Sequence, residues 1–202
     1  MKKLLIVLGV LVVLGIVLVM SAVGSYNGLV NKSEAVDASW AQVENVYQRR
    51  ADLVPNLVRT VQGAANFEQS TLTAVTEARA SVGQIKLPEG SAPTDPAMLA
   101  RFEQAQGQLG SALSRLMVVV ERYPELQATA AFRDLQVQLE GTENRIAVER
   151  GRYNTVAQDY NATIRRIPGA LYANLFGFDK KAYFTAQPGA DAAPVVDFGG
   201  NP

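Results

Sequence analysis

The stretch FRDLQVQLEGTENRIAVERGRYNTVAQDYNATIRRI, residues 132–167, decides the fold. Apolar or aromatic side chains recur in it every seven residues, at Phe132, Leu139, Ile146, Tyr153, Tyr160 and Ile167. A seven-residue repeat sustained over this length is typical of helices that pack against one another at shallow crossing angles. The pattern predicts an all-α protein in which this helix belongs to an elongated, coiled-coil-like, antiparallel four-helix bundle.

A second amphipathic stripe lies nearer the N-terminus, with apolar positions three, four or seven residues apart, at Tyr26, Leu29, Val36, Trp40, Val43 and Tyr47. We expect one continuous helix of about 45 residues, roughly 65–70 Å long, to carry both this stripe and the apolar run before it. Pro55 lacks an amide hydrogen and biases the preceding residue away from helix, so a break is expected there. A second helix is expected from Pro55 to Val82, followed by a proline- and glycine-rich loop from Gly83 to Asp95.

Asp95 followed by Pro96 predicts the cap and the first turn of a third helix. That helix should end at Tyr123, before Pro124. The fourth helix would then exceed the third by more than ten residues. We therefore expect either a break between residues 125 and 130 or a bend at one of the two glycines of the fourth helix, Gly141 and Gly151.

The N-terminal residues 4–23 form an uncharged apolar run. At about 1.5 Å rise per residue, 20 residues match a hydrocarbon core of about 30 Å. The run predicts a transmembrane anchor over residues 1–23 that carries a helical domain over residues 24–186. A cleaved signal peptide is the alternative, although signal peptides usually have apolar regions of only about 7–15 residues.

The orientation of the anchor follows from the basic residues around it. Lys2 and Lys3 precede the apolar run, and the next basic residue is Lys32. Basic residues tend to stay on the cytoplasmic side, so we predict a single-pass protein of the bacterial inner membrane with its helical domain outside the cytoplasm.

Composition excludes several classes of function. Lysine and arginine total 19, as do aspartate and glutamate, so a nucleic-acid partner is not expected. The chain has no cysteine and no histidine, which excludes disulfides, serine-histidine triads, HExxH zinc sites and Glu-x-x-His di-iron sites. We predict no cofactor and no metal.

The chain after Pro168 loses helical periodicity and becomes aromatic between Leu171 and Phe184. If the four helices alternate in direction, this segment returns to the membrane. Its rings and its two lysines, Lys180 and Lys181, suit the membrane interface. The alternative is that the rings cap the core of the bundle. Residues 187–202 are rich in proline, glycine, alanine and aspartate and predict a flexible tail.

Two groups of residues carry a resemblance to a known family. The first is Tyr26-Asn27-x-Leu29-Val30, Trp40 and Arg49-Arg50-x-Asp52-Leu53-Val54-Pro55-Asn56-Leu57. The second is Tyr123-Pro124-Glu125-Leu126, Leu139-Glu140-x-Thr142-Glu143-Asn144-x-Ile146, Arg150-x-x-Tyr153-Asn154, Tyr160-Asn161, Pro168, Phe176-Gly177-Phe178 and Tyr183-Phe184. Their order over residues 1–184 resembles the LemA family. The resemblance implies a membrane-anchored antiparallel helical bundle with no established enzymatic activity. Family descriptions often place the short N-terminus outside, which is opposite to the orientation that the lysines predict.

Candidate partner-binding or register-fixing residues lie in two places. Next to the seam of residues 132–167 are Glu143, Arg150, Asn154 and Asn161, and at the corner expected near Pro55 are Arg50, Asp52 and Asn56. The asparagines either hydrogen-bond neighbouring helices and fix their register, or line a polar groove for a partner. The corner residues suit cap and salt-bridge roles as well as a binding knuckle.

These observations favour a non-enzymatic, membrane-anchored scaffold that binds protein partners or further copies of itself. The alternative is a membrane-surface module that shapes lipid, for which a basic amphipathic face would be expected. An enzyme is the weakest hypothesis. Carboxylate pairs such as Glu140 with Glu143 occur routinely on helix surfaces, and no nucleophile or phosphate-loop motif accompanies them.

Overall fold

The N-terminal helix α1 extends over Lys2–Gln62 in the computed structural model, which describes residues 2–63, 68–88 and 90–185. The predicted break at Pro55 is wrong, because α1 continues through this residue for two further turns. A proline leaves the carbonyl oxygen four residues earlier without its helical donor. Here that carbonyl, of Ala51, accepts a hydrogen bond of 2.9 Å from Nε of Arg79 on the following helix. The packed neighbour therefore satisfies the oxygen that Pro55 leaves without a partner.

The remaining helices are α2 (Gln69–Gln84), α3 (Pro96–Val120), α4 (Pro124–Gln127), α5 (Ala130–Thr163) and α6 (Gly169–Phe176). The described residues contain no strand, and the all-α prediction is confirmed. Asp95 caps α3 as expected, its carboxylate accepting from the amide of Ala97 at 2.8 Å. The length mismatch is resolved by the break between residues 125 and 130, where Thr129 caps α5.

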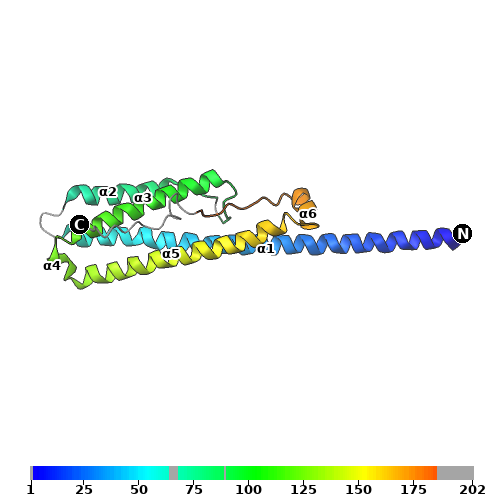
Figure 1. The fold of residues 1–202 in the computed structure, drawn as a ribbon, viewed down its shortest axis with the longest axis horizontal. Helices are drawn as coiled ribbons and strands as arrows, with labels where there is room; N and C mark the ends of the chain where they lie inside the picture. Colours follow the sequence, from blue (N-terminus) through cyan, green and yellow to red (C-terminus); the bar gives the residue numbers. More distant parts are fainter. Residues whose placement is uncertain (1, 64–67, 89, 186–202) are drawn as a thin grey trace, which may run out of the picture.

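The helices run side by side along one axis (Figure 1). α5 lies antiparallel to the second half of α1, and α2 and α3 form another antiparallel pair alongside them. The first half of α1 projects alone beyond the other helices, and every leucine, isoleucine, valine and methionine from Leu4 to Val23 is at least 54% exposed. The α4 turn lies at the end far from this projection, and α6 lies at the end near it. We call the end of the domain near the projection, where α6 lies, the anchor end.

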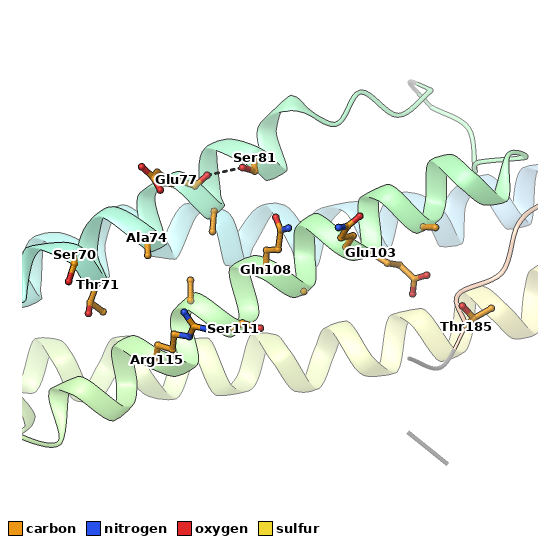
Figure 2. A pocket seen from close by; sticks show the side chains of 15 residues that line it. Ser70, Thr71, Ala74, Glu77, Ser81, Glu103, Gln108, Ser111, Arg115 and Thr185 are labelled. Atoms are coloured by element: carbon orange, nitrogen blue, oxygen red, sulfur yellow. Dashed lines mark hydrogen bonds between the residues drawn. The ribbon is translucent and has the colours of Figure 1, made fainter. Parts of the chain in front are cut away.

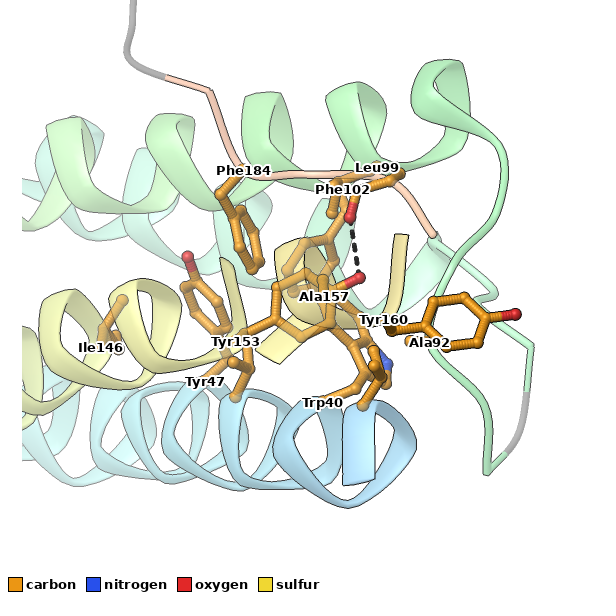
Figure 3. Packing of buried hydrophobic residues seen from close by; sticks show 13 residues of the cluster. Trp40, Tyr47, Ala92, Leu99, Phe102, Ile146, Tyr153, Ala157, Tyr160 and Phe184 are labelled. Atoms are coloured by element: carbon orange, nitrogen blue, oxygen red, sulfur yellow. Dashed lines mark hydrogen bonds between the residues drawn. The ribbon is translucent and has the colours of Figure 1, made fainter. Parts of the chain in front are cut away.

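Two clusters of buried side chains form the core. The cluster far from the anchor is built on α1, α2, α3 and α5 and includes Val54, Val75, Leu116 and Phe132. The cluster at the anchor end is aromatic and is centred on Trp40, which packs edge-on to Phe102 and Tyr153 and is stacked on Phe184 (Figure 3). Aromatic pairs of this geometry add to the stabilisation from burial alone.

The seven-residue seam predicted the buried face of α5. Five of its members, from Phe132 to Tyr160, are buried, but Ile167 is 85% exposed. The repeat fails there because α5 ends at Thr163, four residues earlier. The chain then enters α6, a short helix that the sequence pattern did not predict, and continues without secondary structure from Phe178 to Thr185. The predicted flexible tail lies outside the described residues.

Candidate functional site

Residues 178–185, called the C-terminal strap, run back from α6 along α5 and reach the aromatic cluster (Figure 1). Two asparagines of α5 hold this segment by its backbone. The amide of Asn161 donates to the carbonyl oxygen of Lys181 and accepts from its N–H, both at 2.9 Å. The amide of Asn154 makes the same pair of bonds with Phe184, at 2.8 and 2.9 Å.

Two tyrosines of α5, each directly before one of these asparagines in sequence, also bind the backbone of the strap. The hydroxyl of Tyr153 donates to the carbonyl oxygen of Ala182 at 2.8 Å, and that of Tyr160 donates to the carbonyl oxygen of Asp179 at 2.9 Å. In both pairs the helix residues are seven apart and the strap residues are three apart. Seven helical residues span about 10.5 Å, and three extended residues span about 10 Å, so the two spacings match.

The strap is also tied to the other elements at the anchor end. The amide of Ala182 donates to the carbonyl oxygen of Pro93, in the loop before α3, at 2.9 Å. The carboxylate of Asp37 on α1 pairs with Nζ of Lys181 at 2.8 Å and accepts from the amide of Ala92 at 2.7 Å. Lys181 is only 7% exposed, so this ion pair is largely shielded from water. Asp37 was missed by the sequence analysis, and no local pattern marks it, because its partners are distant in the chain.

The surroundings of the two tyrosines disfavour their ionised forms. Burial raises the pKa of Tyr160 to about 12, and the carboxylates of Asp179 and Asp37 add to the effect. The pKa of Tyr153 is raised further, mainly by burial and also by Asp37 and Tyr183. Both hydroxyls therefore remain protonated donors to the strap at neutral pH.

A second polar cluster joins α1, α3 and α5 near the middle of the domain. The guanidinium of Arg50 donates to Oε1 of Glu143 at 2.9 Å and to the backbone oxygen of Gln106 at 3.0 Å, and it also contacts the side-chain oxygen of Gln106. It lies 5.2 Å from the centre of the Tyr47 ring. The side chain of Arg50 is 5% exposed, whereas that of Glu143 is 44% exposed.

Arg150 links α5 to α3 and to the strap. Its guanidinium pairs with the carboxylate of Glu103 and lies 4.5 Å from the centre of the Phe184 ring. Burial raises the pKa of Glu103, while Arg150 and the backbone of Thr185 act in the opposite direction. Glu103 was not among the candidates from the sequence.

The structure brings five of the seven candidate residues into contacts between elements: Arg50, Glu143, Arg150, Asn154 and Asn161. The other two lie exposed on one face of α1. Asp52 accepts from Gln48 at 2.8 Å, and the side chain of Asn56 contacts Arg59. The corner expected at this place is absent because α1 continues through Pro55, so these two residues form no knuckle.

An open groove of about 990 Å³ lies between α2 and α3 (Figure 2). Small side chains line it on both helices, namely Ser70, Ala74, Ala78 and Ser81 on α2 and Ala100, Gly107, Ser111 and Ala112 on α3. Its charged residues are Glu77, Glu103 and Arg115. Thr185, where the described chain ends, lies at one edge of it. The described residues contain no group of three or more carboxylates close enough to hold a metal ion.

Comparison with known proteins identifies the relatives of this fold. The model of the LemA family matches residues 39–198, more than three quarters of the chain. The chain belongs to the LemA family. The resemblance found in the sequence is thus confirmed, and membership together with the apolar start of α1 indicates a membrane-associated helical protein.

Curated relatives include three named as magnetosome proteins, two of them in one organism. The chain is 30% identical over 189 residues to magnetosome protein MamQ 2 of Paramagnetospirillum magneticum, which covers 85% of this chain and 68% of that protein. It is 29% identical, with the same coverage, to magnetosome protein MamQ of Magnetospirillum gryphiswaldense. Protein LemA of Metamycoplasma hominis is 23% identical over 70% of this chain and 60% of that protein.

Proposed function

We propose that this LemA family member is a non-enzymatic, membrane-tethered scaffold of the bacterial inner membrane. Residues 1–23 anchor it, and residues 24–186 form a helical domain on the extracytoplasmic side that binds a protein partner or a second copy of the chain. Support for the anchor comes from the exposed apolar first half of α1, which is long enough to span a bilayer. The orientation rests on Lys2 and Lys3.

The observation that carries the binding function is the groove between α2 and α3. Alanine, serine and glycine make up eight of its fifteen lining residues and occur on both helices along its length. Small side chains at such positions allow a third helix to approach closely and to bury its own larger side chains between the two. A helical segment of a partner protein therefore fits the groove better than an extended small molecule does.

Charge at the groove supports a protein partner. Among the residues that the structure describes, neither the carboxylate of Glu77 nor the guanidinium of Arg115 has an ion-pair partner. Two free charges of opposite sign on the facing helices give the groove an electrostatic polarity. Such polarity selects the orientation of a bound helix more than it adds affinity.

The polar stripe of α5 is a weaker candidate for partner binding. Its asparagines and tyrosines already hold the strap, so a partner would have to displace residues 178–185 to reach them. We therefore favour the alternative that these asparagines have a structural role. They hold the strap, however, and not a neighbouring helix as the sequence suggested.

Lipid shaping is the second candidate function. It is favoured by the exposed apolar side chains of α6, but that helix is eight residues long and the chain carries equal numbers of acidic and basic residues. Modules that shape membranes generally present a longer basic amphipathic face. Catalysis is supported least, since the chain lacks histidine and cysteine and the names of its relatives mention no reaction.

The scaffold function is tested by site-specific photo-crosslinking of the full chain in intact membranes. A benzophenone amino acid placed at Ala74 or Ser111 should yield discrete adducts, and co-expression of two differently tagged copies separates self-association from binding of another protein. The matched control is the same amino acid at Arg145, on the exposed face of α5.

The proposal would be supported by adducts that form at Ala74 and Ser111 but not at Arg145, with the Ser111 adducts lost when Ala74→Leu narrows the groove. Equal adduct yields at Ala74, Ser111 and Arg145 would show that the groove is not a binding surface, and the scaffold function would lose its main support.

A further inference from the structure

Helix α6 presents an apolar face that no described part of the chain covers. Ile167, Leu171 and Leu175 follow one another at intervals of four residues and are 85%, 66% and 72% exposed. The opposite side of the helix, at Gly169 and Ala173, is buried against the domain. Spacing of four residues within α6 places Leu171 and Leu175 along one stripe, and Ile167 is exposed in the turn just before the helix.

The position of α6 is fixed by close packing. A Cβ added at Gly169 would lie 2.4 Å from the carbonyl oxygen of Thr163, so only glycine permits this approach to the end of α5. Gly177 ends the helix with a φ of 75°, a left-handed conformation that glycine adopts readily, and its N–H donates to the carbonyl oxygen of Ala173. The apolar stripe is therefore held outward by the fold.

Contacts with α1 place α6 just past the C-terminal end of the proposed anchor. The ring of Tyr26 packs edge-on to Phe176, with centroids 4.9 Å apart, and to Phe178 at 5.9 Å. Tyr26 follows Val23, the last residue of the apolar run, by about 4.5 Å along the helix. Tyrosine at this depth is typical of the membrane interface. Helix α6 thus lies beside α1 where the projecting, exposed apolar part of α1 ends (Figure 1).

Basic residues lie beside this face. Arg165 and Arg166 are exposed in the turn between α5 and α6, and neither guanidinium has a partner among the described residues. The nearby Asp159 is already paired with Lys32. Exposed apolar side chains flanked by unpaired arginines match the boundary between acyl chains and phosphate headgroups.

We propose that α6 is a second membrane contact, which lies in the interface of the bilayer that holds the anchor. Ile167, Leu171 and Leu175 enter the acyl boundary, and Arg165 and Arg166 bind the phosphates of anionic lipids. This contact sets the height of the helical domain above the membrane. It rests on the proposal that residues 1–23 span the bilayer, but it is independent of the binding groove and of the orientation of the domain.

Because the chain has no cysteine, single cysteines report depth without background. Nitroxide labels at Leu171→Cys and Leu175→Cys are examined in the full chain, reconstituted in vesicles of phosphatidylcholine with 30% phosphatidylglycerol. Accessibility to oxygen, which concentrates in the acyl region, is compared with accessibility to a water-soluble nickel chelate. Leu14→Cys is the control inside the anchor, and Val137→Cys is an exposed control on α5 far from it.

The expected result is that the labels at Leu171 and Leu175 are several-fold more accessible to oxygen than to nickel, as at Leu14, while the label at Val137 shows the reverse. Nickel accessibility at Leu171 and Leu175 equal to that at Val137 would overturn the proposal. The label at Leu14 separates the two proposals, because an aqueous signal there would instead refute the anchor, and the membrane contact with it.

The proposed binding of Arg165 and Arg166 to lipid phosphates is tested separately. In pure phosphatidylcholine, or in the Arg165→Gln/Arg166→Gln variant, the label at Leu171 should lie at a shallower depth than in the anionic vesicles. Identical depth in all three samples would show that the arginines do not bind lipid phosphates, and this part of the proposal would be wrong.

Discussion

At the residue scale, the buried Arg50 depends on Glu143, whose side chain is nearly half exposed. Removing the acid leaves a guanidinium in the core without its counter-charge, which costs about 3–5 kcal/mol for fully buried pairs. Because water reaches Glu143, we expect Glu143→Gln to lower the free energy of unfolding by about 1–2 kcal/mol in denaturant titrations. The double variant Arg50→Met/Glu143→Gln should be no less stable than the Glu143→Gln single variant, since it also removes the buried charge. Asp52→Asn, on the exposed face, should change stability by less than about 0.5 kcal/mol.

A substitution of Asn161 tests whether its two hydrogen bonds fix the strap on α5. Its amide satisfies both the N–H and the carbonyl oxygen of the buried Lys181, so Asn161→Ala leaves two polar groups without partners. Each costs about 1–3 kcal/mol. We expect a loss of about 2–4 kcal/mol in unfolding free energy and faster proteolysis within residues 178–185. Asn144→Ala, on the exposed side of the same helix, is the matched control. Equal effects of the two substitutions would contradict the structural assignment.

Tyr160 makes the strap sensitive to alkaline pH. Its pKa of about 12 in the folded chain lies above the ordinary tyrosine value of 10.0, so the folded state retains the proton more strongly. The resulting stability is fully present below pH 10 and is lost as the pH rises through about 12. Unfolding free energies measured between pH 9 and 12 should fall along this interval. Tyr160→Phe should reduce the slope of the fall. It should also cost about 1 kcal/mol at neutral pH, through the lost bond to Asp179. An unchanged slope would mean that Tyr160 is not the titrating group.

At the scale of elements, the continuity of α1 depends on a neighbouring helix. Arg79 donates to the carbonyl oxygen of Ala51, for which Pro55 provides no amide. We expect Arg79→Met to lower the unfolding free energy by about 1 kcal/mol, and to have almost no effect in the Pro55→Ala background, where the restored amide bonds that oxygen. A double-mutant cycle measures this coupling. Arg101→Met, an exposed arginine of α3, should show none.

The elements also differ in how far local sequence defines them. The apolar repeat from Phe132 to Tyr160 and the Asp95 cap are local signals, and the structure confirms both. The break near Thr129 was one of two alternatives expected from the lengths of the third and fourth helices, and it is the one present. Pro55 is a local signal too, but its consequence depends on a side chain 24 positions away in sequence. Helix α6 has no apolar repeat that predicts it; Gly177 marks its end locally, but its place in the fold is set by close packing at Gly169 and by the contact of Phe176 with Tyr26.

At the scale of the whole molecule, the central prediction is orientation. Lys2 and Lys3 precede the anchor and no basic residue follows it before Lys32, so protease added to intact spheroplasts should digest the helical domain. The intact mass of the mature protein, recovered only with detergent, should include residues 4–23. Protection in spheroplasts and digestion only after lysis would place the domain in the cytoplasm, as family descriptions often do. The interfacial contact of α6 would remain compatible with either side.

The sequence by itself determined the helical class, the apolar N-terminal helix, the family and most of the buried face of α5. These properties follow from periodicity and composition, which act through the geometry of one helix at a time. Only the tertiary structure decided what Asn154 and Asn161 bind, which groups Asp37 contacts and how α1 passes Pro55. In each of these cases a polar group is satisfied by a partner far along the chain. A buried polar group must find such a partner, but nothing in its local sequence names which one.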